Sequence, residues 1–93
     1  RDEHRALYKQ AIDKWGEAAQ IAMVFEECAE LMLLLSHARR GLKHHSVTRE
    51  DIVGEIADVS LGIEQLCCVF NVSPSEWFAT REDKLRRLKD RLK

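Results

Sequence analysis

The sequence has very few residues that interrupt helices: one proline, Pro74, and four glycines among 93 residues. Aromatic residues make up only 6%, and no long stretch alternates β-branched or aromatic residues with polar ones as a strand would. These scarcities argue against sheet-based architectures and predict a chain that is helical throughout. The length suits a single domain that spans residues 1–93.

Cysteine pairs of the CxxC type, long apolar runs and an excess of one charge are also lacking. Cys28, Cys67 and Cys68 are odd in number and form no CxxC pair, which argues against a disulfide framework or a zinc site and favours a reducing, cytoplasmic setting. No apolar run approaches the ~18 residues of a membrane span, and no signal peptide is visible. The net charge of −1 gives no general attraction to nucleic acids or anionic membranes, so we expect neither as a partner.

Helix start and stop signals divide the chain into four helical segments. Thr48 and Ser73 are good N-caps, and Ser73 is followed by Pro74 and by Glu76, which would complete a capping box. Glycine or asparagine follows the other expected ends, at Gly16, Gly41 and Asn71. The expected helices span residues 3–15, 17–40, 48–70 and 74–93, with a loop over residues 42–47 between the second and the third.

Short connections between these helices predict an all-α, four-helix chain in which sequential helices pack antiparallel. A chain of this length buries only about 60–65% of its unfolded surface, so its own core is marginal. We therefore expect the bundle to be completed by oligomerisation, as a homodimer or a homotetramer.

Acidic residues interrupt two helices where apolar residues would be expected. The segment 17–40 is apolar on almost every side, yet it carries Glu26, Glu27 and Glu30. Glu27 and Glu30 lie within about 60° of each other around the helix. In the segment 48–70, Glu55 and Asp58 share a face with residues that should point inward.

The spacing of these acids predicts that they converge. In an antiparallel hairpin, Glu27 would oppose Asp58 and Glu30 would oppose Glu55, because both pairs are centred between Leu42 and Lys43, within the expected turn. Carboxylates about 5 Å apart repel by roughly 3 kcal/mol at an effective dielectric constant near 20. A hard divalent cation would remove this cost, and oxygen-only ligands suit Mg²⁺ or Mn²⁺. The simpler interpretation, a solvated acidic stripe, explains one such pair better than two in matching register.

The run from Glu26 to Glu30, followed by the run from Glu55 to Asp58, resembles the EExxE…ExxD signature of the all-α nucleoside triphosphate pyrophosphatases, which include MazG-like enzymes. The resemblance covers residues 15–91 and extends to Trp15-Gly16, Gln20 and Met23. It implies Mg²⁺-dependent cleavage of a nucleoside triphosphate to the monophosphate and pyrophosphate, in the removal of unwanted nucleotides. It also implies a homo-oligomer. The implied metal ligands are Glu27, Glu30, Glu55 and Asp58, with Mn²⁺ as a substitute ion. Glu26 would either support the metal ligands from behind or orient the attacking water.

The same resemblance implies phosphate contacts from the last helix. Family members carry a Lys, an Asn four residues later and then an Arg, and Lys84 and Arg91 fit the ends of this pattern. Leu88 stands in place of the Asn, so Arg87, one turn from Lys84, is expected to substitute. A solvated basic tail is the alternative interpretation of this run. Trp15 is a candidate for stacking on the base, although a Trp at the end of an amphipathic helix is more often packed in a core or an interface.

Two other classes of function compete with the hydrolase. A non-catalytic helical interaction or regulatory module would explain the small size and the apolar helices, but it leaves four inward-facing acids unexplained. A nucleic-acid binder that uses the basic C-terminal helix is disfavoured by the net charge and by the lack of a recognisable motif.

Overall fold

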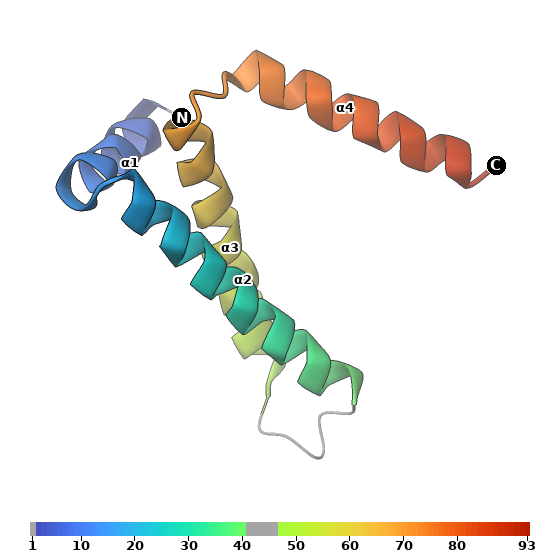
Figure 1. Ribbon diagram of the computed structural model, residues 1–93. Coiled ribbons are helices and arrows are strands. Elements are labelled where there is room, and N and C mark those ends of the chain that lie inside the picture. The colour runs from blue at the N-terminus through green and yellow to red at the C-terminus, as the bar shows by residue number, and fades with distance from the viewer. Residues whose placement is uncertain (1, 41–46) are drawn as a thin grey trace.

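The computed structural model describes residues 2–40 and 47–93, and every regular element in these ranges is an α-helix. The helices are α1 (Asp2–Trp15), α2 (Glu17–Arg39), α3 (Arg49–Val69) and α4 (Pro74–Arg91) (Figure 1). Their ends differ from the predicted ones by at most two residues. In the described part of the chain, no helix has the length and apolar character needed to cross a membrane.

The starts of α3 and α4 are fixed by hydroxyl side chains. Thr48 Oγ1 accepts a hydrogen bond from Asp51 N–H at 3.1 Å, and Asp51 Oδ2 accepts one from Thr48 N–H at 2.9 Å, so the capping box lies here. Ser73 Oγ accepts from Glu76 N–H at 3.1 Å, as predicted for an N-cap. The box predicted at Ser73 lacks its second half, because no described bond runs from Glu76 back to the Ser73 N–H.

Residues with positive φ end two of the helices. Gly16, at φ 88°, separates α1 from α2. Asn71, at φ 55°, ends α3 in a Schellman motif: Val72 N–H donates to Cys67 O at 2.8 Å, and Asn71 N–H donates to Cys68 O at 3.4 Å. Both residues were predicted as helix ends. The predicted turn at Gly41 and most of the predicted loop 42–47 lie outside the described residues.

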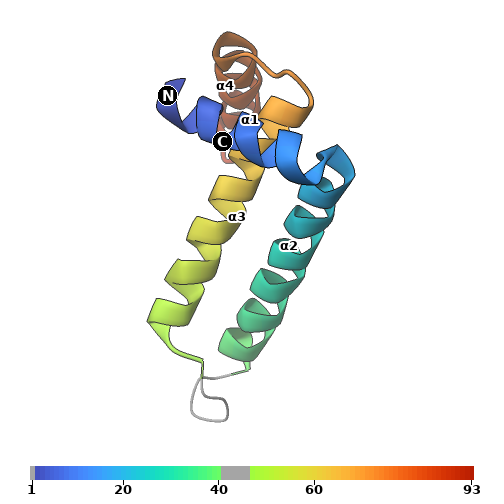
Figure 2. The same ribbon diagram turned by 90° about the vertical axis from the view of Figure 1, so that its left-hand side faces the viewer.

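Helices α2 and α3 form an antiparallel hairpin, and α1 lies across the end of the hairpin where α2 begins and α3 ends (Figure 2). Tyr8 is almost fully buried, and its hydroxyl donates to Glu64 Oε1 on α3 at 3.0 Å. Arg5 donates to Val72 O at 3.1 Å, beyond the end of α3. These two bonds attach α1 to the hairpin.

Helix α4 stands apart from the other three. No described residue of α4 has its Cα within 8 Å of a residue in another helix, and α4 points away from the hairpin (Figure 1). The radius of gyration is 16.2 Å, compared with about 12 Å for a compact domain of this length. The all-α, four-helix prediction is confirmed. The predicted antiparallel bundle is present only as the hairpin with α1 across its end, and its completion by oligomerisation stays a prediction.

Candidate metal centre

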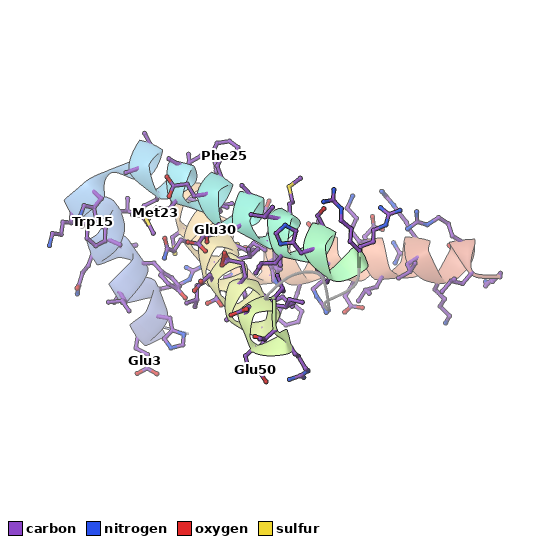
Figure 3. The ribbon with its side chains drawn as sticks, turned by 90° about the horizontal axis from the view of Figure 1, so that it is seen from below. Glu3, Trp15, Met23, Phe25, Glu30 and Glu50 are labelled. Carbon is purple, nitrogen blue, oxygen red and sulfur yellow. The ribbon has the colours of Figure 1, made fainter. Side chains whose placement is uncertain are left out.

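The hairpin brings together acidic side chains from both of its helices. One carboxylate oxygen each from Glu27 on α2 and from Glu55 and Asp58 on α3 lie within 4.8 Å of one another. The carboxylate of Glu30 lies beside this group of three, because it has the largest effect on the pKa of Glu55. In Figure 3, Glu30 lies on the side of α2 that faces α3, whereas Phe25 points away from α3.

The close approach of the two helices beside this cluster depends on a glycine. A Cβ atom added to Gly62 would lie 3.1 Å from Val24 Cγ2 on α2, so a larger residue would push the helices apart. Val24 and Gly62 oppose each other around a centre at Lys43, within one residue of the centre predicted from the spacing of the acids. The structure therefore brings the four predicted metal ligands to one level of the hairpin.

Glu55 experiences the strongest electrostatic strain in the cluster. Only 6% of the residue is exposed. The carboxylate of Glu30, followed by burial and by the carboxylates of Glu27 and Asp58, raises the pKa of Glu55 to about 8. Each of these influences disfavours a second negative charge at the same place. At neutral pH, the cluster without a cation therefore retains a proton that a solvated carboxylic acid would have lost.

The cluster also contains a polar atom without a partner. Glu27 Oε2 is buried and has no hydrogen bond, and an unpaired buried oxygen of this kind is costly. None of the four acids forms an ion pair with Lys or Arg in the described part of the chain, where the ion pairs lie at the C-terminal end. Among residues 2–40 and 47–93, no Lys or Arg therefore balances the charge of these acids through an ion pair.

The donor set fits a hard divalent cation. All candidate ligands are carboxylate oxygens, which Mg²⁺, Mn²⁺ and Ca²⁺ prefer. Oxygens on opposite sides of one Mg²⁺ are about 4.2 Å apart, so oxygens within 4.8 Å of one another need only small side-chain rotations to share an ion. A cation would neutralise the repulsion at Glu55 and give Glu27 Oε2 a partner.

The remaining predicted site residues do not join the cluster within this chain. Lys84, Arg87 and Arg91 lie on α4, away from α2 and α3. Arg87 forms an ion pair with Asp83 Oδ2 at 3.1 Å. Trp15 is 58% exposed at the end of α1, where Lys14 Nζ lies 5.3 Å from the centre of its ring. The roles predicted for these four residues remain predictions.

Glu26 is exposed on α2 next to Glu27, and its predicted role in orienting water also remains a prediction. Gln20 was not predicted as a site residue, but it is the most deeply buried polar side chain described, at 1% exposure, and its Oε1 has no hydrogen-bond partner. Gln20 lies seven residues before Glu27 and therefore on the same side of α2. This spacing was the feature of the sequence from which its position could have been predicted.

In comparisons with protein-family models, curated proteins and solved structures, no family model, protein or structure matches the chain.

Proposed function

We propose that the chain is a Mg²⁺-dependent nucleoside triphosphate pyrophosphohydrolase of the MazG-like type, which cleaves a nucleoside triphosphate to the monophosphate and pyrophosphate. One observation carries the proposal: three carboxylates from two helices lie within 4.8 Å of one another, a fourth acts on Glu55 beside them, and no Lys or Arg of the described residues forms an ion pair with any of the four. Such a cluster costs stability in the absence of a ligand. Its cost is accounted for if the cluster serves to hold a metal ion.

Glu27, Glu30, Glu55 and Asp58 would hold the ion in this proposal. When bound, Mg²⁺ supplies a Lewis acid that polarises a phosphate oxygen and lowers the pKa of bound water. Glu26 is exposed beside Glu27, where its carboxylate can accept a hydrogen bond from the attacking water.

The substrate contacts belong to residues outside the cluster. Lys84, Arg87 and Arg91 would bind the phosphates and Trp15 would stack on the base, in an enzyme that works as a homodimer or homotetramer and removes unwanted nucleotides. The open arrangement of the chain supports an oligomer, because large apolar side chains are exposed on every helix, among them Leu7, Phe25, Ile56 and Phe78.

This exposed apolar surface also supports a second candidate, a non-catalytic helical interaction module. The two candidates differ in what the acids do. If the module is correct, replacing an acid of the cluster by its amide raises stability and removes no activity, because repulsion is relieved and no ligand is lost.

The test is a pyrophosphate-release screen of the full chain against the common ribonucleoside and deoxyribonucleoside triphosphates, with and without Mg²⁺. We expect release from at least one substrate, dependent on Mg²⁺ and abolished in Glu30→Gln and Asp58→Asn. Glu50→Gln is the matched control, because Glu50 is exposed in the first turn of α3, outside the cluster.

A thermal melt separates binding from turnover. A ligand that binds only the folded state raises the melting temperature, by about 10 °C or more for a domain of this size at one hundred times its dissociation constant. Wild-type protein that shows no Mg²⁺-dependent rise and releases no pyrophosphate from any triphosphate would refute the hydrolase.

A further inference from the structure

Helix α4 and its C-cap residue, Leu92, carry an apolar stripe that no other described helix covers. Phe78, Leu85, Leu88 and Leu92 follow one another at spacings of seven, three and four residues, which places them on one side of the helix. Their exposed fractions range from 43% to 78%. An isolated helix of 18 residues is only marginally stable in water, so this stripe needs a surface to pack against.

The connection between α3 and α4 is short and is held by several contacts. Asn71 is held at positive φ by the Schellman motif, and Arg5 donates to Val72 O at 3.1 Å. Ser73 caps α4 in an extended conformation that the following Pro74 favours. A reversal of α4 would need a change in the backbone at residues 71–73, which these contacts restrain. Short, constrained connections of this kind favour the exchange of an element between copies over its intramolecular docking.

The hairpin presents a groove with the matching character. Ile56, Ile63 and Cys67 lie on one side of α3, roughly 110° around the helix from Glu55. Together with Leu31 on α2 and Trp77 at the start of α4, they line a largely apolar groove of about 580 Å³. Ile56 is 52% exposed and Ile63 is 39% exposed, so the groove lacks a cover in the single chain.

The solvent-accessible surface area of the chain indicates how much area a partner would have to bury. The chain exposes 7552 Å², whereas a folded monomer of 10.8 kDa is expected to expose about 5,500 Å². The excess of about 2,000 Å² lies within the range that one subunit of a permanent dimer buries. A second copy that exchanges one helix in each direction would bury an area of this order.

The charges of the helices favour pairing of α4 with a hairpin over pairing of two α4 helices. Helices α2 and α3 together contain nine acidic residues and two arginines, whereas α4 contains six basic and four acidic residues. Two α4 helices would repel each other, while α4 and a hairpin attract.

We propose that two copies of this chain exchange their C-terminal helices, so that the apolar stripe of each α4 packs in the groove along α3 of the other copy. The proposal specifies the contact that would build an oligomer. It stands whether or not the acidic cluster is catalytic, because it uses a different side of α3.

The first experiment measures self-association of the full chain by sedimentation equilibrium. We expect a dimer or a multiple of it, with a dissociation constant that rises at least 100-fold in Leu85→Glu/Leu88→Glu. Ala79→Glu/Thr80→Glu adds the same charge on the opposite side of α4, so it should associate like wild type. A monomeric wild type, or an acidic stripe variant that associates like wild type, would overturn the proposal.

The second experiment tests which surfaces meet. Ile56→Lys/Ile63→Lys places positive charges in the groove, and we expect this variant alone to be monomeric. Mixed with Leu85→Glu/Leu88→Glu, it should form a heterodimer, because an acidic α4 meets a basic groove at one contact and both surfaces of the other contact are native. Pairing of α4 with α4 predicts no such rescue, so two helical, monomeric variants that fail to associate on mixing contradict the exchange. If either pair of changes abolishes the helical circular dichroism signal, Leu88→Glu and Ile63→Lys are mixed instead.

Discussion

The α2–α3 hairpin and α4 are both long, charged helical units, but they handle charge in opposite ways. On α4 the charges are balanced locally: Arg86 and Arg87 both pair with Asp83 on the exposed surface, within one turn of the helix. Such exposed pairs contribute little to stability. In the hairpin, none of the four acids forms an ion pair with a described Lys or Arg, and one of the acids is buried. The contrast is the one that our two proposals require: an α4 whose charges leave it free to dock on a second copy, and a hairpin whose acids would hold a cation.

Glu55→Gln tests this contrast most directly. The amide keeps the shape of the side chain and is neutral without a proton, whereas Glu55 must take up a proton on folding at neutral pH, so the melting temperature of the metal-free protein should rise. Pyrophosphate release should fall at least about 100-fold, because a ligand and its charge are lost together. Differential scanning fluorimetry and the release assay, with Glu50→Gln as control, measure the two effects. A loss of stability without Mg²⁺ would show that the carboxylates do not crowd one another.

The pH dependence of Mg²⁺ binding is the second prediction. The pKa of Glu55 is raised from 4.5 to about 8, so between these values the folded protein holds a proton that the unfolded chain has released. The stability of the metal-free protein should therefore fall as pH rises through this window. Mg²⁺ must displace the proton, so its apparent affinity should increase up to tenfold per pH unit below about pH 8 and level off above it.

Isothermal titration from pH 6 to pH 9 measures this trend, and Glu55→Gln provides the control. The variant should bind weakly and lose the steep dependence on pH. A wild-type affinity that stays constant between pH 6 and pH 8 would contradict the raised pKa.

The contact between α1 and the hairpin gives a third, smaller effect. Tyr8 donates to Glu64 at 3.0 Å, and Tyr8→Phe should cost about 0.5–1.5 kcal/mol of unfolding free energy. Burial, followed by the bond to Glu64 and its charge, raises the pKa of Tyr8 above 10.0. Because Tyr8 is the only tyrosine, absorbance at the phenolate band reports its titration directly. Glu64→Gln keeps an acceptor but removes the charge, so the midpoint should move down towards the ordinary value.

The local fold followed from the sequence because the helix signals are local. Thr48, Ser73, Pro74 and Asn71 act on their own backbone or on residues up to four positions away, so their effects require no knowledge of the rest of the chain. The convergence of the acids was also predictable, because two pairs three residues apart on facing helices share one centre.

The placement of α4 was not predictable in the same way. Short connections favour antiparallel packing, but the backbone at Asn71 and the bond from Arg5 to Val72 O set the direction of α4. Arg5 lies 67 residues away from Val72 in sequence, and no local pattern indicates that contact. For the same reason, the positions of Lys84 and Arg91 relative to the acids depend on how chains assemble, which one sequence does not specify.

Two glycines of α3 allow the smallest and most closely matched comparison. Nothing lies within 4 Å of a Cβ added to Gly54, so Gly54→Ala should gain helix propensity alone and raise the unfolding free energy by up to about 1 kcal/mol. At Gly62 the same methyl group meets Val24 Cγ2 at 3.1 Å, and the helices must separate by a few tenths of an ångström. Gly62→Ala should therefore be less stable than Gly54→Ala, although both gain the same propensity, and it should weaken Mg²⁺ binding, which Gly54→Ala leaves unchanged. Chemical denaturation measures the difference in unfolding free energy, and titration with Mg²⁺ measures the difference in affinity. If the two variants behave equally in both assays, the spacing of α2 and α3 at Gly62 does not control the cluster.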